Sequence, residues 1–340
     1  ARRPPAGLGW GVTWTMCTKS VRRRGASRRA AREELLLSVS VCNSALAREV
    51  GIEIASRFAA AAKSLRSSSS PMSVTLKCVH SEGVGHLRYT SDGAHLLTAG
   101  ADALVKVFDV AAGGVNSNEP KTVEHPNETV VSTLAMHPKG KGFVTGADSN
   151  QVTQFSFPGG EVEKVVLRAS CAIRHVEYDA KGRYLAAGLD DGVIKFGFLA
   201  MGQFTPLKAH GDSVLSLAFD PQGRYLASTS ADGTCRVWDL EADTPEVVKV
   251  VQLSGRIAPG SPQRLRAAWH PSGGSLAVPH GAAVHVLERE TWEVQSVLRG
   301  AHSKEVSLIS WCDNGRYLAS GGLDRQLFVW DLSTAETLDR

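Results

Sequence analysis

Short runs of alternating apolar and polar residues, separated by turn residues, fill the chain from residue 73 onward. Between residues 209 and 240, two such runs (214–219 and 225–228) flank a Pro-Gln-Gly turn, and a third run ends at Trp238. A period of two predicts strands, and turns this short join antiparallel neighbours. The stretch therefore predicts a meandering antiparallel sheet.

Four side chains in this stretch have the spacing of a buried hydrogen-bonded relay. Counting back from Trp238, Asp232 is 6 residues away, Ser228 is 10 and His210 is 28. A strand Ser, a turn Asp, a His and an indole N–H can satisfy one another when they are buried. The spacing resembles the structural tetrad of the WD-repeat family, in which one repeat makes one propeller blade.

The same spacing recurs along the chain. The residues corresponding to Trp238 are predicted at 108, 155, 196, 238, 286 and 330, so successive anchors are 41 to 48 residues apart, close to one blade. Blades two, three and five are degenerate: Ser149 replaces the turn Asp in blade two, Asp190 alone remains in blade three, and blade five keeps nothing. Three tetrads are predicted, the first with Phe in place of Trp: His80, Thr98, Asp102 and Phe108; His210, Ser228, Asp232 and Trp238; and His302, Ser320, Asp324 and Trp330.

The predicted fold class is all-β, a WD-repeat β-propeller over residues 73–340 with six recognisable blades ending near residues 110, 157, 198, 240, 288 and 332. A further strand-like run at 73–79 precedes blade one. In closed propellers an N-terminal strand often completes the last blade and leaves only protected edges. Either six blades close on themselves, or a seventh blade is truncated after Arg340.

Charge separates the first 72 residues from the rest. They contain 11 Arg and 2 Lys against 4 Glu, a net charge of +9, whereas the whole chain carries +4, which leaves −5 for residues 73–340. We expect the Arg-, Ser- and Ala-rich stretch to be a disordered extension rather than a domain. Upstream sequence translated in error, a nucleic-acid or nuclear-import tail and an organelle transit peptide all remain open.

No motif for catalysis, a cofactor or a metal stands out. The sequence has no H-E-x-x-H, no Walker sequence and no G-x-S-x-G elbow, and its six Cys form no C-x-x-C pair. The apolar run 35–42 is too short to cross a membrane. The sequence therefore predicts a protein that is not an enzyme, has no cofactor and no membrane partner, and keeps its thiols reduced.

The predicted binding surface is the narrow top face of the propeller. In WD propellers the residues three and five beyond the His position, and the residue before the turn Asp, line this face. Here these positions are mostly small or apolar and include no Lys or Arg, which favours an apolar peptide anchor over a phosphate backbone. The candidates are Ile173, Leu189, Ser213, Leu215, Ala231, Leu265, Glu305 and Leu323. Basic residues around blade three are interpreted as a solvated face or an electrostatic patch: Lys164, Arg168, Arg174, Lys181 and Arg183.

Blade five carries a more specific resemblance. Ala-Val-Pro stands at 277–279, Arg289-Glu-Thr-Trp292 follows the third strand, and Phe-Ser-Phe-Pro-Gly at 155–159 closes blade two. These features resemble the N-terminal propeller of a replisome adaptor family: acidic nucleoplasmic DNA-binding protein, chromosome transmission fidelity protein four, and WD-repeat and HMG-box DNA-binding protein.

The resemblance implies a nuclear, non-catalytic scaffold that links proteins of the replication fork and chromatin, with roles in DNA repair and the mitotic cell cycle. Contacts with the replicative helicase and DNA polymerase alpha belong mostly to other parts of such proteins. It also implies seven blades, weak association with DNA or chromatin at most, and no oligomerisation through this part. A general WD scaffold of another pathway, such as a ubiquitin-ligase substrate receptor or a ribosome-assembly factor, is the alternative.

Overall fold

The computed structural model describes residues 80–81, 84–109, 120–208, 210–242, 244–253 and 265–332 in full. It also gives three strands near the N-terminus: β1 (Gly11–Ser20), β2 (Glu33–Val41) and β3 (Thr75–Lys77). Strand β1 pairs antiparallel with both β2 and β3. The predicted strand 73–79 thus contains β3. Strands β1 and β2 lie within the stretch 1–72 that was predicted to be a disordered extension, and the other residues of that stretch lie outside the described residues.

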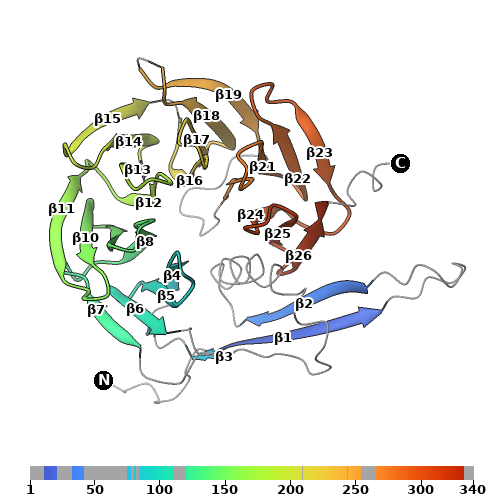
Figure 1. The fold of residues 1–340 in the computed structure, drawn as a ribbon, viewed down its shortest axis with the longest axis horizontal. Coiled ribbons are helices and arrows are strands. Elements are labelled where there is room, and N and C mark those ends of the chain that lie inside the picture. The colour runs from blue at the N-terminus through green and yellow to red at the C-terminus, as the bar shows by residue number, and fades with distance from the viewer. Residues whose placement is uncertain are drawn as a thin grey trace, which may run out of the picture.

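Six antiparallel sheets follow one another around a ring in chain order, and each is one blade (Figure 1). The first three are four-stranded meanders. Blade one contains β4 (Val84–Tyr89), β5 (His95–Gly100), β6 (Leu104–Asp109) and β7 (Lys121–Glu124); blade two β8 (Val131–Met136), β9 (Gly142–Ala147), β10 (Gln151–Ser156) and β11 (Val162–Arg168); blade three β12 (Ile173–Tyr178), β13 (Tyr184–Leu189), β14 (Val193–Phe198) and β15 (Gln203–Lys208).

Blades four and five are also four-stranded, whereas blade six has three strands among the described residues. Blade four contains β16 (Val214–Phe219), β17 (Tyr225–Ser230), β18 (Thr234–Asp239) and β19 (Glu246–Gln252); blade five β20 (Ala268–Trp269), β21 (Ser275–His280), β22 (Ala283–Glu288) and β23 (Val294–Leu298); blade six β24 (Val306–Trp311), β25 (Tyr317–Gly322) and β26 (Leu327–Asp331). The prediction of an all-β, six-bladed propeller is confirmed.

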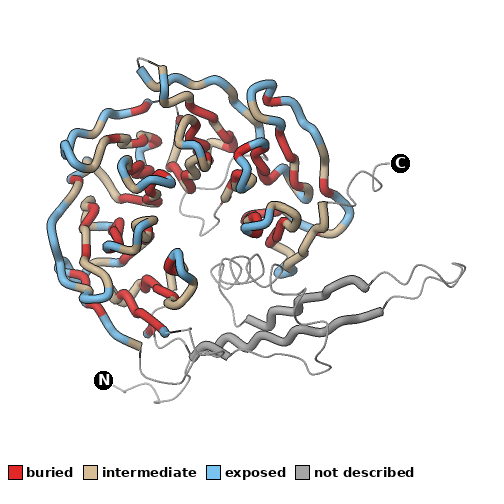
Figure 2. The backbone as a smooth tube through the Cα atoms, viewed as in Figure 1, coloured by how far each residue is buried: buried red, intermediate tan, exposed pale blue. Residues whose placement is uncertain are grey.

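Burial explains the hydrophobic pattern of each strand. The second strand of a blade packs against neighbouring sheets on both faces, so β17 (Tyr225–Ser230) is buried throughout its length. The outermost strand alternates instead, and β19 is exposed at every second residue. Figure 2 shows this gradient, with buried residues on the inner strands and exposed ones at the rim.

The hydrophobic core lies between blades rather than in one central mass. One cluster joins Tyr225 and Val237 of blade four to Trp269 and Leu276 of blade five. Similar clusters join blades one and two, two and three, three and four, and five and six. Each blade therefore depends on its neighbours to bury its faces.

Polar contacts also join adjacent inner strands. The backbone N–H of Leu134 donates to Nδ1 of His86 at 3.4 Å, and that of Leu217 donates to Nδ1 of His175 at 3.2 Å. One ion pair skips a blade: Nη2 of Arg88 on β4 lies 2.6 Å from Oε2 of Glu177 on β12. Blades one and three are thus joined directly, past blade two.

Hydrogen bonds also link the turns between the first and second strands in three pairs of adjacent blades. The hydroxyl of Ser91 donates to the carbonyl of Pro138 at 2.8 Å, and Nε2 of Gln222 donates to the carbonyl of Ser272 at 2.8 Å. In blade five, Nε2 of His270 lies 3.1 Å from the carbonyl oxygen of Gly315 in the next turn. Each of these bonds reaches one blade forward.

The pairing register corrects two predicted anchors. In blade four Leu226 pairs with Trp238, and the corresponding pairs are Leu185 with Gly197 in blade three and Leu276 with Leu287 in blade five. Both anchors therefore lie one residue later than the predicted 196 and 286. In blade three, Gly192 adopts a φ of 81°, as Gly233 does at 83°, so the turn Asp is Asp191 rather than Asp190. A slip of one residue moves every side chain of a strand to the opposite face.

No helix among the described residues is long and apolar enough to cross a membrane.

Candidate protein-interaction faces

The blade-four tetrad forms a continuous buried relay. The indole N–H of Trp238 donates to Oγ of Ser228 at 2.9 Å, and this oxygen lies 2.7 Å from Nε2 of His210. On the other side of the ring, Nδ1 of His210 lies 3.1 Å from Oδ2 of Asp232. The carboxylate also accepts the backbone N–H of Gly211 at 3.0 Å, which fixes the loop that enters the blade.

Blades one and six repeat this arrangement with one difference. In blade six His302 lies 2.9 Å from Ser320, which accepts the N–H of Trp330 at 2.8 Å, and 3.1 Å from Asp324. In blade one His80 lies 2.8 Å from Oγ1 of Thr98 and 2.7 Å from Oδ1 of Asp102. Phe108 is buried at 5% exposure, and since it has no N–H the relay there ends at the threonine.

Electrostatics assigns His210 a structural role. Burial lowers the pKa of His210 and outweighs the opposing effect of Asp232. Burial alone would raise the pKa of Asp232, but hydrogen bonds from Thr234, Gly211 and His210 hold this pKa at about 2. A neutral imidazole between a hydroxyl and a permanently ionised carboxylate is satisfied on both nitrogens, so it neither titrates near neutral pH nor faces a substrate.

Four of the eight predicted top-face residues are buried, so they cannot present their side chains to a peptide. Ile173 and Leu189 are 0% exposed, Leu265 is 1% and Ala231 is 6%. The other four are partly exposed: Ser213, Leu215, Glu305 and Leu323. The eight predicted residues therefore do not form one continuous apolar surface for a peptide.

The register of blade three gives the physical reason for part of this correction. Tyr178 pairs with Leu185 as Phe219 pairs with Leu226, so the residue that corresponds to Leu215 is Arg174, not Ile173. Likewise Asp190, not Leu189, precedes the turn Asp. The dipeptide Asp191-Gly192, which matches Asp232-Gly233 of blade four, is the sequence signal that would have given the correct register.

A charged network therefore occupies the top face over blades two to four. Nε of Arg174 donates to Oδ1 of Asp190 at 2.8 Å, and Nη1 lies 3.7 Å from Oδ1 of Asp148 on the blade-two turn. From blade four, the hydroxyl of Ser213 donates to the same Asp190 oxygen and contacts its backbone carbonyl at 3.1 Å. Both Arg174 and Asp190 have 40% of their side-chain area exposed.

Arg174 and Asp190 stabilise each other's charge. The hydrogen bond to Asp190 is the main cause of the raised pKa of Arg174. The bond from Arg174 lowers the pKa of Asp190, and Ser213 adds to this effect against the opposing effect of burial. Both groups are therefore ionised at neutral pH. They offer a fixed, half-exposed arginine and two carboxylates to a polar segment of a partner.

Other candidate chemistry is sparse in the described part of the chain. No group of three or more His, Cys, Asp or Glu side chains there is placed to hold a metal ion. Burial raises the pKa of the Cys235 thiol to about 12, which leaves it unreactive at neutral pH.

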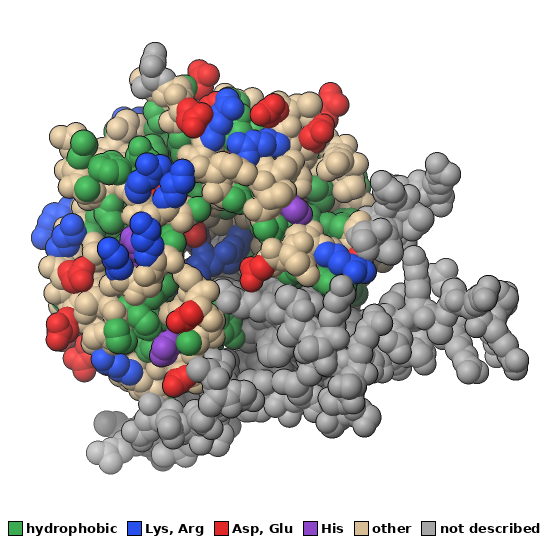
Figure 3. Space-filling model, in the orientation of Figure 1, with side chains coloured by type: hydrophobic (Ala, Val, Ile, Leu, Met, Phe, Trp, Pro, Cys, Tyr) green, Lys and Arg blue, Asp and Glu red, His purple; other side chains and the backbone are tan. Residues whose placement is uncertain are grey.

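The opposite face carries the turns between the first and second strands, and it is more basic over blades two and three (Figure 3). Lys139 and Lys141 lie in the turn between β8 and β9, and Lys181 and Arg183 lie in the turn between β12 and β13. All four residues are exposed. We call these four residues the basic turn pair.

Comparison with known proteins gives the same architecture. The family described as the WDHD1 first WD40 domain matches residues 77–340. Mouse WD repeat and HMG-box DNA-binding protein 1 is 29% identical over 264 residues, which are 77% of this chain and 23% of that protein. Minichromosome loss protein 1 of Schizosaccharomyces pombe is 24% identical over 263 residues, and protein hir1 of the same yeast is 24% identical over 281. These two matches cover 76% and 70% of this chain and 31% and 30% of the yeast proteins, so the chain spans less than a third of each of the three relatives.

Proposed function

We propose a function for this chain, which belongs to the family of the WDHD1 first WD40 domain. Propellers of this family are generally non-catalytic and bind other proteins. We infer that this one serves in the nucleus as the protein-interaction module of an adaptor that links replication-fork and chromatin proteins.

The names of the relatives support the replication and chromatin part of the proposal. One relative is a WD repeat and HMG-box DNA-binding protein, and another is named for the loss of minichromosomes. The match to each covers about three quarters of this chain. The match to the F-box-like/WD repeat-containing protein TBL1Y of Homo sapiens is shorter and covers 39% of the chain.

The interaction role rests on one observation: the polar side chains of the tetrads are buried, whereas those of the top face are exposed to a partner. The tetrad side chains satisfy one another and are buried, so they contribute stability rather than recognition. Arg174 and Asp190 are held in place yet half exposed. The pre-oriented charged groups over blades two to four, together with the partly exposed Leu215 of blade four and Leu323 of blade six, provide polar and apolar contacts for an extended peptide.

The top face is suited to a protein rather than to duplex DNA. Residues 73–340 carry a net charge of −5, and the one arginine of the network faces two carboxylates. Non-specific DNA affinity depends on releasing counterions from several phosphates, which a surface of this charge does not do. Any association with DNA through this part of the chain is therefore weak.

Quantitative co-precipitation from nuclear extract tests the proposal. The full chain should enrich proteins of the replication fork or of chromatin, and the double variant Arg174→Ala/Leu323→Asp should lose them. Val294→Asp serves as the control, because Val294 is 49% exposed on the outer strand β23 and away from the top face. Enrichment of ubiquitin-ligase or pre-ribosomal proteins instead, or equal recovery with the double variant, would contradict the proposal.

A further inference from the structure

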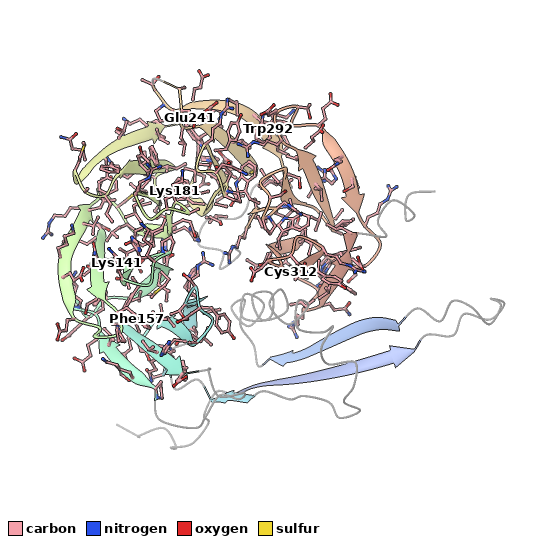
Figure 4. All side chains as sticks on the ribbon, viewed as in Figure 1. Lys141, Phe157, Lys181, Glu241, Trp292 and Cys312 are labelled. Carbon is pink, nitrogen blue, oxygen red and sulfur yellow. The ribbon has the colours of Figure 1, made fainter. Side chains whose placement is uncertain are left out.

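We propose that the basic turn pair (Lys139, Lys141, Lys181 and Arg183) is a second binding surface, which takes an acidic Asp/Glu-rich segment of a partner protein. It lies on the face opposite the top face, so it is separate from the surface assigned above. Figure 4 labels Lys141 and Lys181, which project from neighbouring turns of the ring on this face.

The two turns form one surface because a histidine packs between them. His137 begins the blade-two turn, and its ring stacks edge-on against Tyr178 of blade three with centroids 5.3 Å apart. The ring also lies directly under Gly182, where an added Cβ would come within 2.4 Å of Nε2. Contact this close holds the Lys139–Lys141 turn against the Lys181–Arg183 turn.

No described carboxylate neutralises the charges of the basic turn pair, and comparison of the blades shows why. In blade four Arg224 precedes the Tyr225–Asp239 pair, and its Nη2 lies 2.9 Å from Oδ2 of Asp239. In blade six Arg316 contacts Asp331 in the same way, at 2.7 Å. The aspartate at the end of the third strand thus neutralises the cation that precedes the second strand.

Blades two and three keep the cation but have lost this aspartate. Lys141 precedes the Gly142–Ser156 pair, and Arg183 precedes the Tyr184–Phe198 pair. Within the described part of the chain, no member of the basic turn pair forms an ion pair. The buried carboxylate in this turn, Asp179, is occupied by the backbone N–H groups of residues 181, 183 and 184.

The charges lie close enough to act on His137. Burial is the main cause of the lowered pKa of His137, and Lys141 and Lys139 lower it further. Lys139 and Lys141 lie on one turn, and Lys181 and Arg183 lie on the turn that packs against it, so four exposed cations occupy neighbouring turns of one face. Such a surface attracts and orients negative charge.

The size and surroundings of the surface favour an acidic peptide over nucleic acid. Over the other blades the same face also carries exposed carboxylates: Asp92, Glu241, Glu288, Glu290 and Asp313. A duplex long enough to release several counterions would approach these carboxylates, whereas a short segment would not. No Phe, Tyr or Trp side chain in the described residues is exposed, so single-stranded bases have nothing on which to stack.

Two variants of the full chain that change the net charge equally test the proposal. In the first, Lys139, Lys141, Lys181 and Arg183 are all replaced by Glu. In the control, four exposed basic residues elsewhere, Lys164, Arg168, Lys208 and Lys304, are replaced by Glu. The probe is a fluorescein-labelled twelve-residue peptide of alternating Asp and Glu, and unchanged melting temperatures establish that both variants are folded.

We expect the first variant to weaken peptide binding by about ten-fold or more, since four exposed charge pairs of modest strength are lost together. The control should bind within about two-fold of the unmodified chain at the same ionic strength. Carbodiimide coupling should join the peptide to Lys139, Lys141 or Lys181, which separates this surface from the basic residues 1–72. Equal weakening in both variants, or cross-links confined to residues 1–72, would overturn the proposal. Tighter binding of a 20-base-pair duplex, lost in the first variant, would overturn it in favour of nucleic acid.

Discussion

Replacing Asp232 by alanine should destabilise the propeller strongly. The carboxylate accepts hydrogen bonds from Gly211 N at 3.0 Å and from Thr234 N at 2.9 Å, contacts His210 at 3.1 Å, and is 8% exposed. Its pKa falls from 3.8 to about 2, which corresponds to roughly 2 kcal/mol of preference for the ionised form in the folded state. Loss of a charged acceptor that leaves buried donors unsatisfied costs about 2–3 kcal/mol.

For a domain of this size, that loss lowers the melting temperature by about 5–10 °C. Differential scanning calorimetry at pH 7 measures it, with Asp148→Ala as the matched control. Asp148 is 44% exposed and makes one ionic contact at 3.7 Å, so its removal should cost less than about 0.5 kcal/mol. Equal losses in the two variants would refute the assignment of the tetrad.

The pH dependence of this difference gives a second test. A carboxylate whose pKa is depressed by folding stabilises the protein above its unfolded pKa, and this stabilisation disappears as the pH falls through the folded pKa. The gap between unmodified protein and Asp232→Ala should therefore be complete above about pH 4 and shrink toward pH 2. Urea denaturation at a series of pH values measures the gap. A constant gap across this range would show that ionisation of Asp232 is not its source.

Further changes probe separate features of the ring. Trp330→Phe should lower the free energy of unfolding, measured by urea denaturation, by about 1 kcal/mol, because it removes the hydrogen bond from the indole N–H to Ser320. The loss should be no larger, since blade one has Phe108 at the same position. An unchanged free energy of unfolding would mean that the indole hydrogen bond contributes nothing. Gly182→Ala should lower the melting temperature far more than Gly140→Ala: both glycines have positive φ, but only at Gly182 would the new Cβ meet His137, and similar losses would contradict this packing. At pH 8 iodoacetamide should modify Cys235 only after unfolding, as followed by mass spectrometry, because its thiol has a pKa of about 12; rapid modification of the folded protein would contradict its burial.

Contacts between residues of the same blade could be predicted from the sequence. The tetrad depends on fixed numbers of residues between a turn, a strand and its neighbour, so the side chains that meet in blade four follow from spacing alone. Blade three shows the limit of this reasoning. Asp190 and Asp191 both fit the turn, and only the positive φ of Gly192 selects the second.

That single choice changed the predicted chemistry of the top face. With the wrong register, Ile173 and Leu189 face a peptide, whereas with the observed register Arg174 and Asp190 do. Contacts between blades were beyond prediction for a different reason. His137 and Gly182 are 45 residues apart, and no periodicity in the chain indicates that one turn packs under the other.

The ion pair between Arg88 and Glu177 constrains the ring differently from all contacts between adjacent blades. Contacts between neighbours set the separation of two sheets, but each leaves some freedom in the angle at which the next sheet is added. A bond from blade one to blade three is a chord across that arc, and its length limits the sum of two successive angles. The curvature of this part of the ring, and with it the width of the central opening, thus depends on one pair of side chains as well as on packed faces.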